Sequence, residues 1–226
     1  MSLLLSIILP CYNVEHFLQE CLDSIYDCNL CDSDFEVLCI DDCSPDNSIV
    51  VLKNNAVSHS NLRIISHSVN KGLGGARNTG IQEARGRYLW FVDSDDKIIG
   101  KNLKSVLTKA IREELDVLGF NYRRIDEKGC VLSDHIVFDE WSTQNGLSFV
   151  EKNFGKSIVQ HMGFVWRFIY RVDYLRDHHL TFPENRFWED TVFMPQALIN
   201  ADRVASVSEI LYSYRVNQSS ISGVFS

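Results

Sequence analysis

The sequence has no surplus of positive charge, and this absence narrows the partners it can have. Its 226 residues carry 22 Lys and Arg against 30 Asp and Glu, which gives a formal net charge of −8. A protein that binds a nucleic-acid backbone needs a basic face, so we expect no nucleic-acid partner. A nucleotide remains compatible with this charge, because one metal ion can offset its phosphates locally.

Long apolar runs are missing as well. No stretch approaches the roughly 18 apolar residues that a membrane-spanning helix needs, and the N-terminus lacks the basic and apolar regions of a signal peptide. With four prolines and 45% apolar residues, the composition is that of a globular protein with a sizeable core. We therefore expect a cytoplasmic protein and leave peripheral contact with a membrane face open.

The seven cysteines form no clear disulfide or metal pattern. Their number is odd, and Cys39 lies inside an apolar run that is typical of a buried strand. Cys28-x2-Cys31 followed by Cys39-x3-Cys43 loosely resembles a zinc site, but the spacing between the two pairs is short. Free thiols in a reducing compartment are the better interpretation.

Strand-like and helix-like segments alternate through the first 100 residues. Continuous apolar runs predict buried strands, and apolar residues at helical spacing predict helices. The predicted strands cover 3–9, 35–40, 62–65 and 88–92, and the predicted helices cover 14–26, 48–56 and 74–84. This alternation predicts an α/β fold, with a mostly parallel, Rossmann-like sheet flanked by helices.

Beyond residue 100 the alternation becomes less regular. Helical spacing predicts helices over 103–115, 172–178 and 189–201. Strand-like segments cover 116–122, 163–170, 204–207 and 210–215, and 138–153 carries mixed signals of helical turns and loop.

Three of the predicted strands end in polar clusters. These are Pro10-Cys11-Tyr12-Asn13, Asp41-Asp42 and Asp93-Ser94-Asp95-Asp96. Ligands of open α/β sheets bind outside the carboxyl ends of the strands, so we expect the clusters on one rim. Neighbouring carboxylates repel one another unless a cation lies among them, and Mg²⁺ is usually held by one or two carboxylates with substrate phosphates. The alternative is that each cluster is a solvated turn that caps the next helix.

A glycine-rich segment with two cations opens the third predicted helix. It reads Asn70-Lys71-Gly72-Leu73-Gly74-Gly75-Ala76-Arg77-Asn78. Glycines allow close backbone approach, and amides at a helix N-terminus attract phosphate oxygens, which Arg77 can also contact. The P-loop pattern is absent, and no Gly-x-Gly-x-x-Gly follows the first strand. An ordinary tight turn into a helix is the alternative.

Five segments in this order resemble the inverting family 2 glycosyltransferases, which have the GT-A fold. They cover residues 6–13, 40–46, 70–78, 93–96 and 188–193, and so span nearly the whole chain. One departure is Cys43, where the family usually has Gly in an Asp-Asp-Gly-Ser loop. A residue other than Gly suggests that the backbone does not need a positive φ there.

The resemblance implies a UDP-sugar donor, bound by residues 1–100, with an acceptor-side half over 101–226 in one continuous domain. Asp42 would contact the uracil, Asp93 the ribose or the metal, and Asp95 would bind Mg²⁺ or Mn²⁺ that bridges the diphosphate. The other donor contacts that we expect are Pro10, Tyr12, Asn13, Lys71, Gly72, Arg77, Ser94 and Arg215. The last of these belongs to a segment over 214–222 that resembles a family segment closing over the diphosphate.

An inverting transfer also needs a base that takes the proton of the acceptor hydroxyl. Asp190 matches the family's base, and its neighbour Glu189 is the competing assignment. Both carboxylates could instead decorate the first turn of a helix, where the helix dipole favours them. We expect Trp166 and Trp188 on the acceptor side, where sugar faces stack on aromatic rings, although core packing would explain each ring singly.

Two other functions fit the same sheet. A catalytically silent sugar-nucleotide-binding domain would keep the fold and lose the chemistry, and the presence of both Asp95 and Asp190 disfavours it. A nucleotidyltransferase would need a basic glycine loop directly after the first strand, where this chain has Pro10-Cys11-Tyr12-Asn13-Val14. A glycan or a lipid-linked molecule fits as acceptor. The sugar, the linkage, the oligomeric state and any segment beyond the C-terminus stay open.

Overall fold

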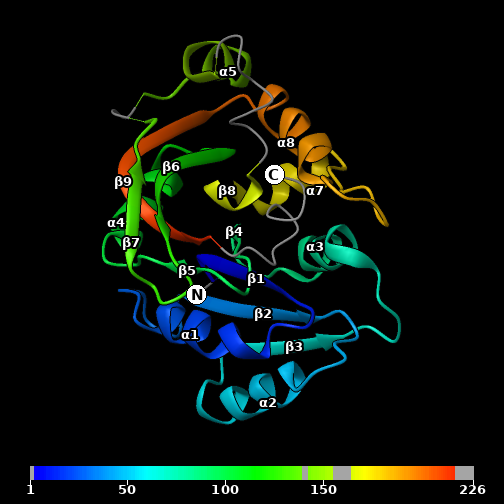
Figure 1. Cartoon of the computed structure of the whole chain (residues 1–226). Helices are drawn as coiled ribbons and strands as arrows, with labels where there is room; N and C mark the ends of the chain where they lie inside the picture. Colours follow the sequence, from blue (N-terminus) through cyan, green and yellow to red (C-terminus); the bar gives the residue numbers. More distant parts are fainter. Residues whose placement is uncertain (1–2, 139–141, 155–163, 217–226) are drawn as a thin grey trace.

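The computed structural model of the chain describes residues 3–138, 142–154 and 164–216 (Figure 1). Its first four strands form the parallel sheet that the apolar runs predicted. They are β1 (Leu5–Cys11), β2 (Phe35–Asp41), β3 (Leu62–Ser66) and β4 (Tyr88–Phe91). Strand β1 lies between β2 and β4, and β3 pairs with the outer side of β2, all in parallel. Every residue of β1, β2 and β4 is buried, which explains why these strands are apolar without alternation.

The helices of the first half cover both faces of this sheet. They are α1 (Glu15–Tyr26), α2 (Ser48–Ser58) and α3 (Gly72–Glu83). Helix α1 buries Leu18, Cys21, Leu22 and Ile25, which share one helical stripe. Helices α1 and α2 contribute to one apolar core, and α3 contributes to a second core on the opposite face. The predicted α/β layering is therefore confirmed.

The second half adds strands of both directions to the same sheet. They are β5 (Lys97–Ile98), β6 (Val117–Ile125), β7 (Val131–His135), β8 (Phe168–Arg171) and β9 (Val204–Arg215). The order is β3-β2-β1-β4-β8-β6-β9-β5, with β7 on β6. Strand β8 runs antiparallel to both β4 and β6, whereas β6 and β9 are parallel. The complete sheet is thus mixed, and its parallel part is the N-terminal half.

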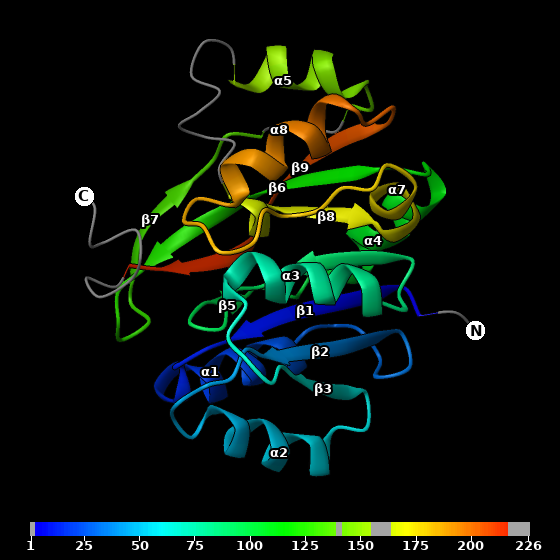
Figure 2. The same cartoon turned by 90° about the vertical axis from the view of Figure 1, so that its right-hand side faces the viewer.

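The remaining helices are α4 (Leu103–Arg112), α5 (Gly146–Phe154), the 3-10 helix η2 (Val165–Arg167), α7 (Val172–Asp177) and α8 (Asp190–Ile199). Figure 1 shows α3, α7 and α8 on one side of the sheet, with α1 and α4 on the other. From the first side, α3 and α8 lie in front of the sheet (Figure 2). The N-terminus of α8 thereby lies close to the C-terminal end of β4, where Arg77 bridges Glu189 and Asp93.

Several predictions for the second half need correction. The two late strands are one strand, β9, because an irregular register opposite Gly119 and Asn121 lets it continue past the break in its apolar pattern. The predicted strand over 163–170 begins as η2, and only Phe168–Arg171 pairs in the sheet. Strands β5 and β7 were not predicted; β5 has only two residues, and β7 is a largely exposed edge strand.

Candidate active site

The ends of β1, β2 and β4 bring the predicted polar clusters to one edge of the sheet. Cys11 pairs with Asp41 at the end of β1 and β2, and Ile8 pairs with Phe91 at the end of β4. The residues that follow these strands therefore leave the sheet side by side. Tyr12 and Asn13 are exposed at this edge, whereas Pro10 and Ser94 are buried.

Arg77 of α3 joins the loop after β4 to the start of α8. Its Nη2 lies 2.8 Å from Asp93 Oδ1, and its Nη1 lies 2.5 Å from Glu189 Oε1. The side chain is buried, with its guanidinium 5.5 Å from the centre of the Phe182 ring. Burial lowers the pKa of Arg77, but Asp93 and Glu189 outweigh it and raise this pKa above its usual value. The sequence predicted a phosphate contact for Arg77; the structure instead uses both terminal nitrogens to hold two carboxylates in place.

The acidic loop after β4, residues 93–96, carries three carboxylates, and the positive groups around it do not balance their charge. Burial, followed by the charge of Asp93, raises the pKa of Asp95 to about 6. Asp96 is buried and accepts hydrogen bonds from the Arg215 backbone N–H at 2.6 Å and the Tyr212 hydroxyl at 2.7 Å. Asp96 therefore anchors the loop to β9. Burial, followed by the charges of Asp95 and Asp93, raises the pKa of Asp96 well above its usual value as well, so Asp95 and Asp96 both lie in an unfavourable electrostatic environment, and of the two only Asp95 is partly exposed.

Asp190 lies at the first position of α8, directly after the Arg77 partner Glu189. Burial raises the pKa of Asp190 to about 6, with Glu189 and Asp93 adding to the rise and Arg77 opposing it. The structure thus places the predicted base within the electrostatic reach of the acidic loop. Glu189 is buried and held in an ion pair, whereas Asp190 is partly exposed.

Three residues other than glycine at this site adopt a positive φ. They are Asn13 at 57°, Cys43 at 61° and Trp188 at 62°. The expectation that Cys43 would not need a positive φ is therefore wrong. Cys43 adopts the left-handed conformation although a residue with a side chain is disfavoured there. Backbone strain of this kind persists only where the surrounding structure imposes it, and it is concentrated at functional sites.

Asp42, predicted to contact the base, is enclosed by the loop before α3. Its Oδ1 accepts a hydrogen bond from the Lys71 backbone N–H at 2.9 Å and lies 2.6 Å from His67 Nδ1. His67 Nε2 is 2.9 Å from the Thr79 hydroxyl. Gly72 follows with φ 75° and donates its N–H to the Asn70 side chain. Sequence reasoning missed His67, because a single histidine just after the end of β3 carries no pattern.

Two predicted site residues lie in the interior instead. Trp166 is 3% exposed and stacks on Tyr212 with ring centres 4.4 Å apart, so it cannot offer a face to a sugar. Arg215 is 1% exposed, and its guanidinium donates to the backbone oxygens of Asp95 and Glu127 and to Glu20. We therefore assign Arg215 to holding the acidic loop rather than to the diphosphate.

Residues 217–222 of the predicted closing segment lie outside the described residues. Trp188 is exposed, as an acceptor contact requires.

The carboxylates fit a divalent ion only in combination with a ligand. In the described ranges, no group of three or more His, Cys, Asp or Glu side chains is arranged to hold a metal. Asp93 and Asp95 offer two carboxylates, and Mg²⁺ is commonly held by that number with substrate phosphates completing its shell. A cation would also relieve the repulsion from Asp93, which adds to the effect of burial in raising the pKa of Asp95.

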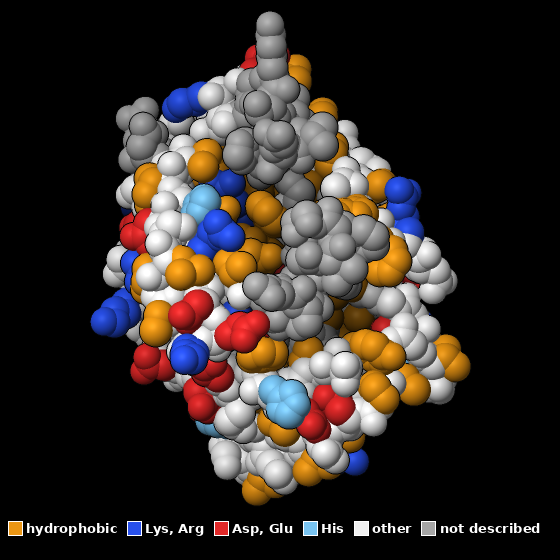
Figure 3. Space-filling view, viewed as in Figure 1, with side chains coloured by type: hydrophobic (Ala, Val, Ile, Leu, Met, Phe, Trp, Pro, Cys, Tyr) orange, Lys and Arg blue, Asp and Glu red, His pale blue; other side chains and the backbone are white. Residues whose placement is uncertain are grey.

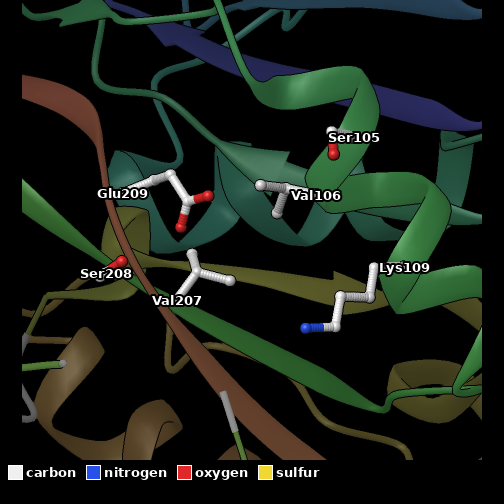
Figure 4. Close-up of a pocket in the computed structure, with 6 residues that line it drawn as sticks. All are labelled: Ser105, Val106, Lys109, Val207, Ser208 and Glu209. Atoms are coloured by element: carbon white, nitrogen blue, oxygen red, sulfur yellow. The ribbon is translucent and has the colours of Figure 1, made fainter. Parts of the chain in front are cut away.

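Two hollows of the described surface are lined by residues other than the predicted site residues. One, of about 220 Å³, lies between α4 and β9 and is lined by Ser105, Val106, Lys109, Val207, Ser208 and Glu209 (Figure 4). The other, of about 470 Å³, includes Glu20, Asp23 and Asp27 of the α1 region, where Figure 3 shows acidic side chains gathered at the lower left. No predicted site residue lines either hollow.

Comparison with known proteins gives consistent relatives. The family model described as glycosyl transferase family 2 matches residues 6–178. The uncharacterized glycosyltransferase EpsJ of Bacillus subtilis is 34% identical over 98% of this chain and 63% of its own length. Poly(ribitol-phosphate) beta-glucosyltransferase of Bacillus spizizenii is 30% identical over 95% of this chain and 32% of its own. The chain thus spans less than two thirds of either relative.

Solved structures give the same result for the fold. Staphylococcus aureus TarS 1-349 in complex with UDP-GlcNAc superposes with a TM-score of 0.81, at 27% identity, over 96% of this chain and 60% of that one. The mannosyltransferase PcManGT of Pyrobaculum calidifontis, in complex with GDP-Man and Mn²⁺, has a TM-score of 0.68 at 14% identity, over 97% and 59%. The chain therefore has the GT-A fold and belongs to glycosyl transferase family 2.

Proposed function

We propose that this chain is a metal-dependent inverting glycosyltransferase that moves a sugar from a UDP donor to a hydroxyl of a glycan or lipid-linked acceptor. The proposal rests mainly on one observation: Arg77 links the acidic loop after β4 to the start of α8. Arg77 ties Asp93, on the donor loop, to Glu189, the residue before Asp190. A donor group and a base are thereby fixed relative to each other, as a transfer reaction requires.

The charge state of Asp190 suits a base. A general base works best when its pKa lies near the operating pH, and burial brings the pKa of Asp190 to about 6. In the proposed step, the acceptor hydroxyl attacks the anomeric carbon of the donor and passes its proton to the Asp190 carboxylate, while the bond to the nucleoside diphosphate breaks. Glu189 is the less suitable base because its Oε1 is already bound to Arg77.

The donor side of the proposal rests on Asp42, Asp93 and Asp95. A uridine donor is supported by TarS, a relative solved in complex with UDP-GlcNAc and with UDP. Asp93 and Asp95 would hold Mg²⁺ or Mn²⁺ together with the diphosphate, and the ion would stabilise the charge that develops on the leaving phosphate. Lys71, Gly72 and the exposed residues Tyr12 and Asn13 complete the proposed donor contacts.

The acceptor side is proposed to lie in residues 101–226, with Trp188 exposed beside Asp190. A relative's name records transfer to poly(ribitol-phosphate), which supports a polymeric acceptor here. None of the helices in the described ranges is long and apolar enough to cross a membrane. The described cysteines are free, and we place the reaction on the cytoplasmic side, with peripheral membrane contact at the acceptor.

The proposal is tested by a donor screen followed by turnover. UDP-glucose, UDP-galactose and their N-acetyl forms are each added with Mn²⁺ and a poly(ribitol-phosphate) acceptor, and the thermal midpoint and release of UDP are measured. At least one donor is expected to raise the midpoint and to release UDP in wild type, whereas Asp190→Asn keeps the midpoint shift and loses the release. A shift with no release in either protein would indicate the silent binding domain. Pyrophosphate release from UTP and a sugar 1-phosphate would indicate a nucleotidyltransferase.

A further inference from the structure

The Asp42 carboxylate is oriented before any ligand arrives. Its Oδ1 receives the Lys71 backbone N–H and His67 Nδ1, at 2.9 and 2.6 Å. The side chains of Asp42 and His67 are 3% and 5% exposed, so neither contact competes with bulk water. Oδ2 has no hydrogen bond within the described residues, yet it is not among the polar atoms sealed from solvent. One oxygen is therefore saturated and the other is available.

The hydrogen bonds also fix the tautomer of His67. A carboxylate oxygen can only accept, so Nδ1 carries the proton that points at Asp42. At the opposite end of the ring, Nε2 lies 2.9 Å from the Thr79 hydroxyl, whose single proton it accepts when the ring is neutral; the same hydroxyl lies 3.1 Å from the Gly75 carbonyl. Thr79 and Gly75 belong to α3, and the His67 backbone N–H donates to the Asp41 carbonyl. The ring is thus clamped between α3 and the end of β2.

We propose that His67 is a positioning residue for recognition of the donor's base, holding Asp42 so that Oδ2 selects a base with an N–H edge. Uracil presents an imide N–H there, whereas cytosine presents a lone pair at the same ring position. A mobile carboxylate could turn to the amino group of cytosine, but a clamped one cannot. Specificity then comes from leaving the wrong base unpaired against a fixed acceptor.

The inference rests on the proposed function, because it needs a nucleotide at Asp42. It adds that discrimination between bases depends on a residue outside the five matching segments. Removing one hydrogen bond to a charged group weakens binding by about tenfold or more. The loss of affinity should affect binding of the nucleotide base and not binding of the phosphates.

Two substitutions separate the two ends of the ring. The amide nitrogen of His67→Asn takes the place of Nδ1 and can still donate to Asp42, whereas that of His67→Gln approaches the place of Nε2 and Thr79. Dissociation constants for UDP, CDP and pyrophosphate are measured with Mn²⁺ by calorimetry, and thermal midpoints verify folding. We expect wild type and His67→Asn to prefer UDP over CDP, and His67→Gln to lose about tenfold in UDP affinity and in that preference. Pyrophosphate binding should be equal in all three.

An unchanged preference in folded His67→Gln would overturn the inference, and so would an equal loss in both variants, which would indicate packing alone. Thr79→Val provides a second test if His67→Gln does not fold: removing the partner of Nε2 should reduce the preference by about threefold, and no reduction would contradict the clamp. Wild type that binds UDP and CDP equally well would overturn the inference alone. Wild type that does not bind UDP would overturn the proposed function with it.

Discussion

Asp42 follows β2 and Asp95 follows β4, the two strands that flank β1, but the surroundings of the two carboxylates differ. Asp42 receives two hydrogen bonds from within the chain. Asp95 is largely buried beside Asp93, and burial, followed by the charge of Asp93, raises its pKa to about 6. The first carboxylate is stabilised by hydrogen bonds from the chain itself, whereas the second is destabilised by burial and by a neighbouring charge.

Under the proposed function, the two carboxylates would bind different parts of the donor. A carboxylate with fixed orientation and one free oxygen suits a neutral N–H group, whose hydrogen bond depends on direction. A carboxylate pair with excess charge suits a metal ion, whose attraction depends mainly on charge. The two ends of a bound nucleotide, base and diphosphate, differ in the same way.

The largest effect is expected on turnover, from a substitution of Asp190, the third carboxylate of the candidate site. Asp190→Asn removes the proposed base while keeping the shape of the side chain, and turnover should fall about 10²–10⁴-fold. UDP affinity should stay close to that of wild type, because Asp190 acts on the acceptor. Steady-state kinetics and calorimetry on the same preparation measure both quantities.

Glu189→Gln is the matched control for that substitution. It removes the charge from the adjacent residue, whose Oε1 is bound to Arg77. If Glu189→Gln abolishes turnover while Asp190→Asn remains fully active, the base has been assigned to the wrong carboxylate.

A second large effect is expected on stability. Arg77→Met leaves Asp93 and Glu189 without their shared cation, and breaking a buried ion pair in this way costs about 3–5 kcal/mol of unfolding free energy. Urea unfolding measures the loss. Arg112→Met is the control, since its side chain is 71% exposed and should change stability by less than about 0.5 kcal/mol. Equal small losses in both variants would show that the Arg77 bridge contributes little.

Asp95→Asn should have the opposite sign. The folded-state pKa of Asp95 lies above its ordinary value, so folded protein binds this proton more tightly, and stability is lost as pH rises from about 4 to 6. Without metal at pH 7.5, Asp95→Asn should therefore gain about 1–3 kcal/mol, and this gain should vanish at pH 4. Urea unfolding in EDTA at both pH values is the measurement. A loss of stability at pH 7.5 would contradict the proposed excess of charge.

A smaller effect is expected from pH alone. The pKa of Asp190 near 6 predicts that kcat/KM falls about tenfold per pH unit below that value, as the base becomes protonated. The profile is recorded between pH 5 and 8 at saturating metal. An activity that stays constant down to pH 5 would show that the rate does not depend on the protonation of Asp190.

The N-terminal half was predictable because local pattern and global position agree there. Continuous apolar runs marked β1, β2 and β4, and the residues after them lie at the expected edge. The later sheet was not predictable, since β8 joins β4 to β6 through pairs such as Tyr88 with Arg171, far apart in the chain.

Burial explains the misassigned side chains of the candidate site. Trp166 and Arg215 are the right residue types for a sugar and a phosphate, but packing against Tyr212 and pairing with Glu20 place them inside. The sequence also gave no sign that Arg77 would bridge two carboxylates, because the partners lie 16 and 112 positions away.

The most direct test of the central claim is the metal dependence of UDP binding. Calorimetric titration of UDP is carried out with Mn²⁺ and with EDTA, on wild type and on Asp95→Asn. Wild type should bind UDP more tightly with Mn²⁺, and Asp95→Asn should lose about 1–3 kcal/mol of that metal-dependent affinity. Equal affinities in the two proteins, or no effect of Mn²⁺ on wild type, would contradict the claim that the loop after β4 is built to receive a cation with the diphosphate.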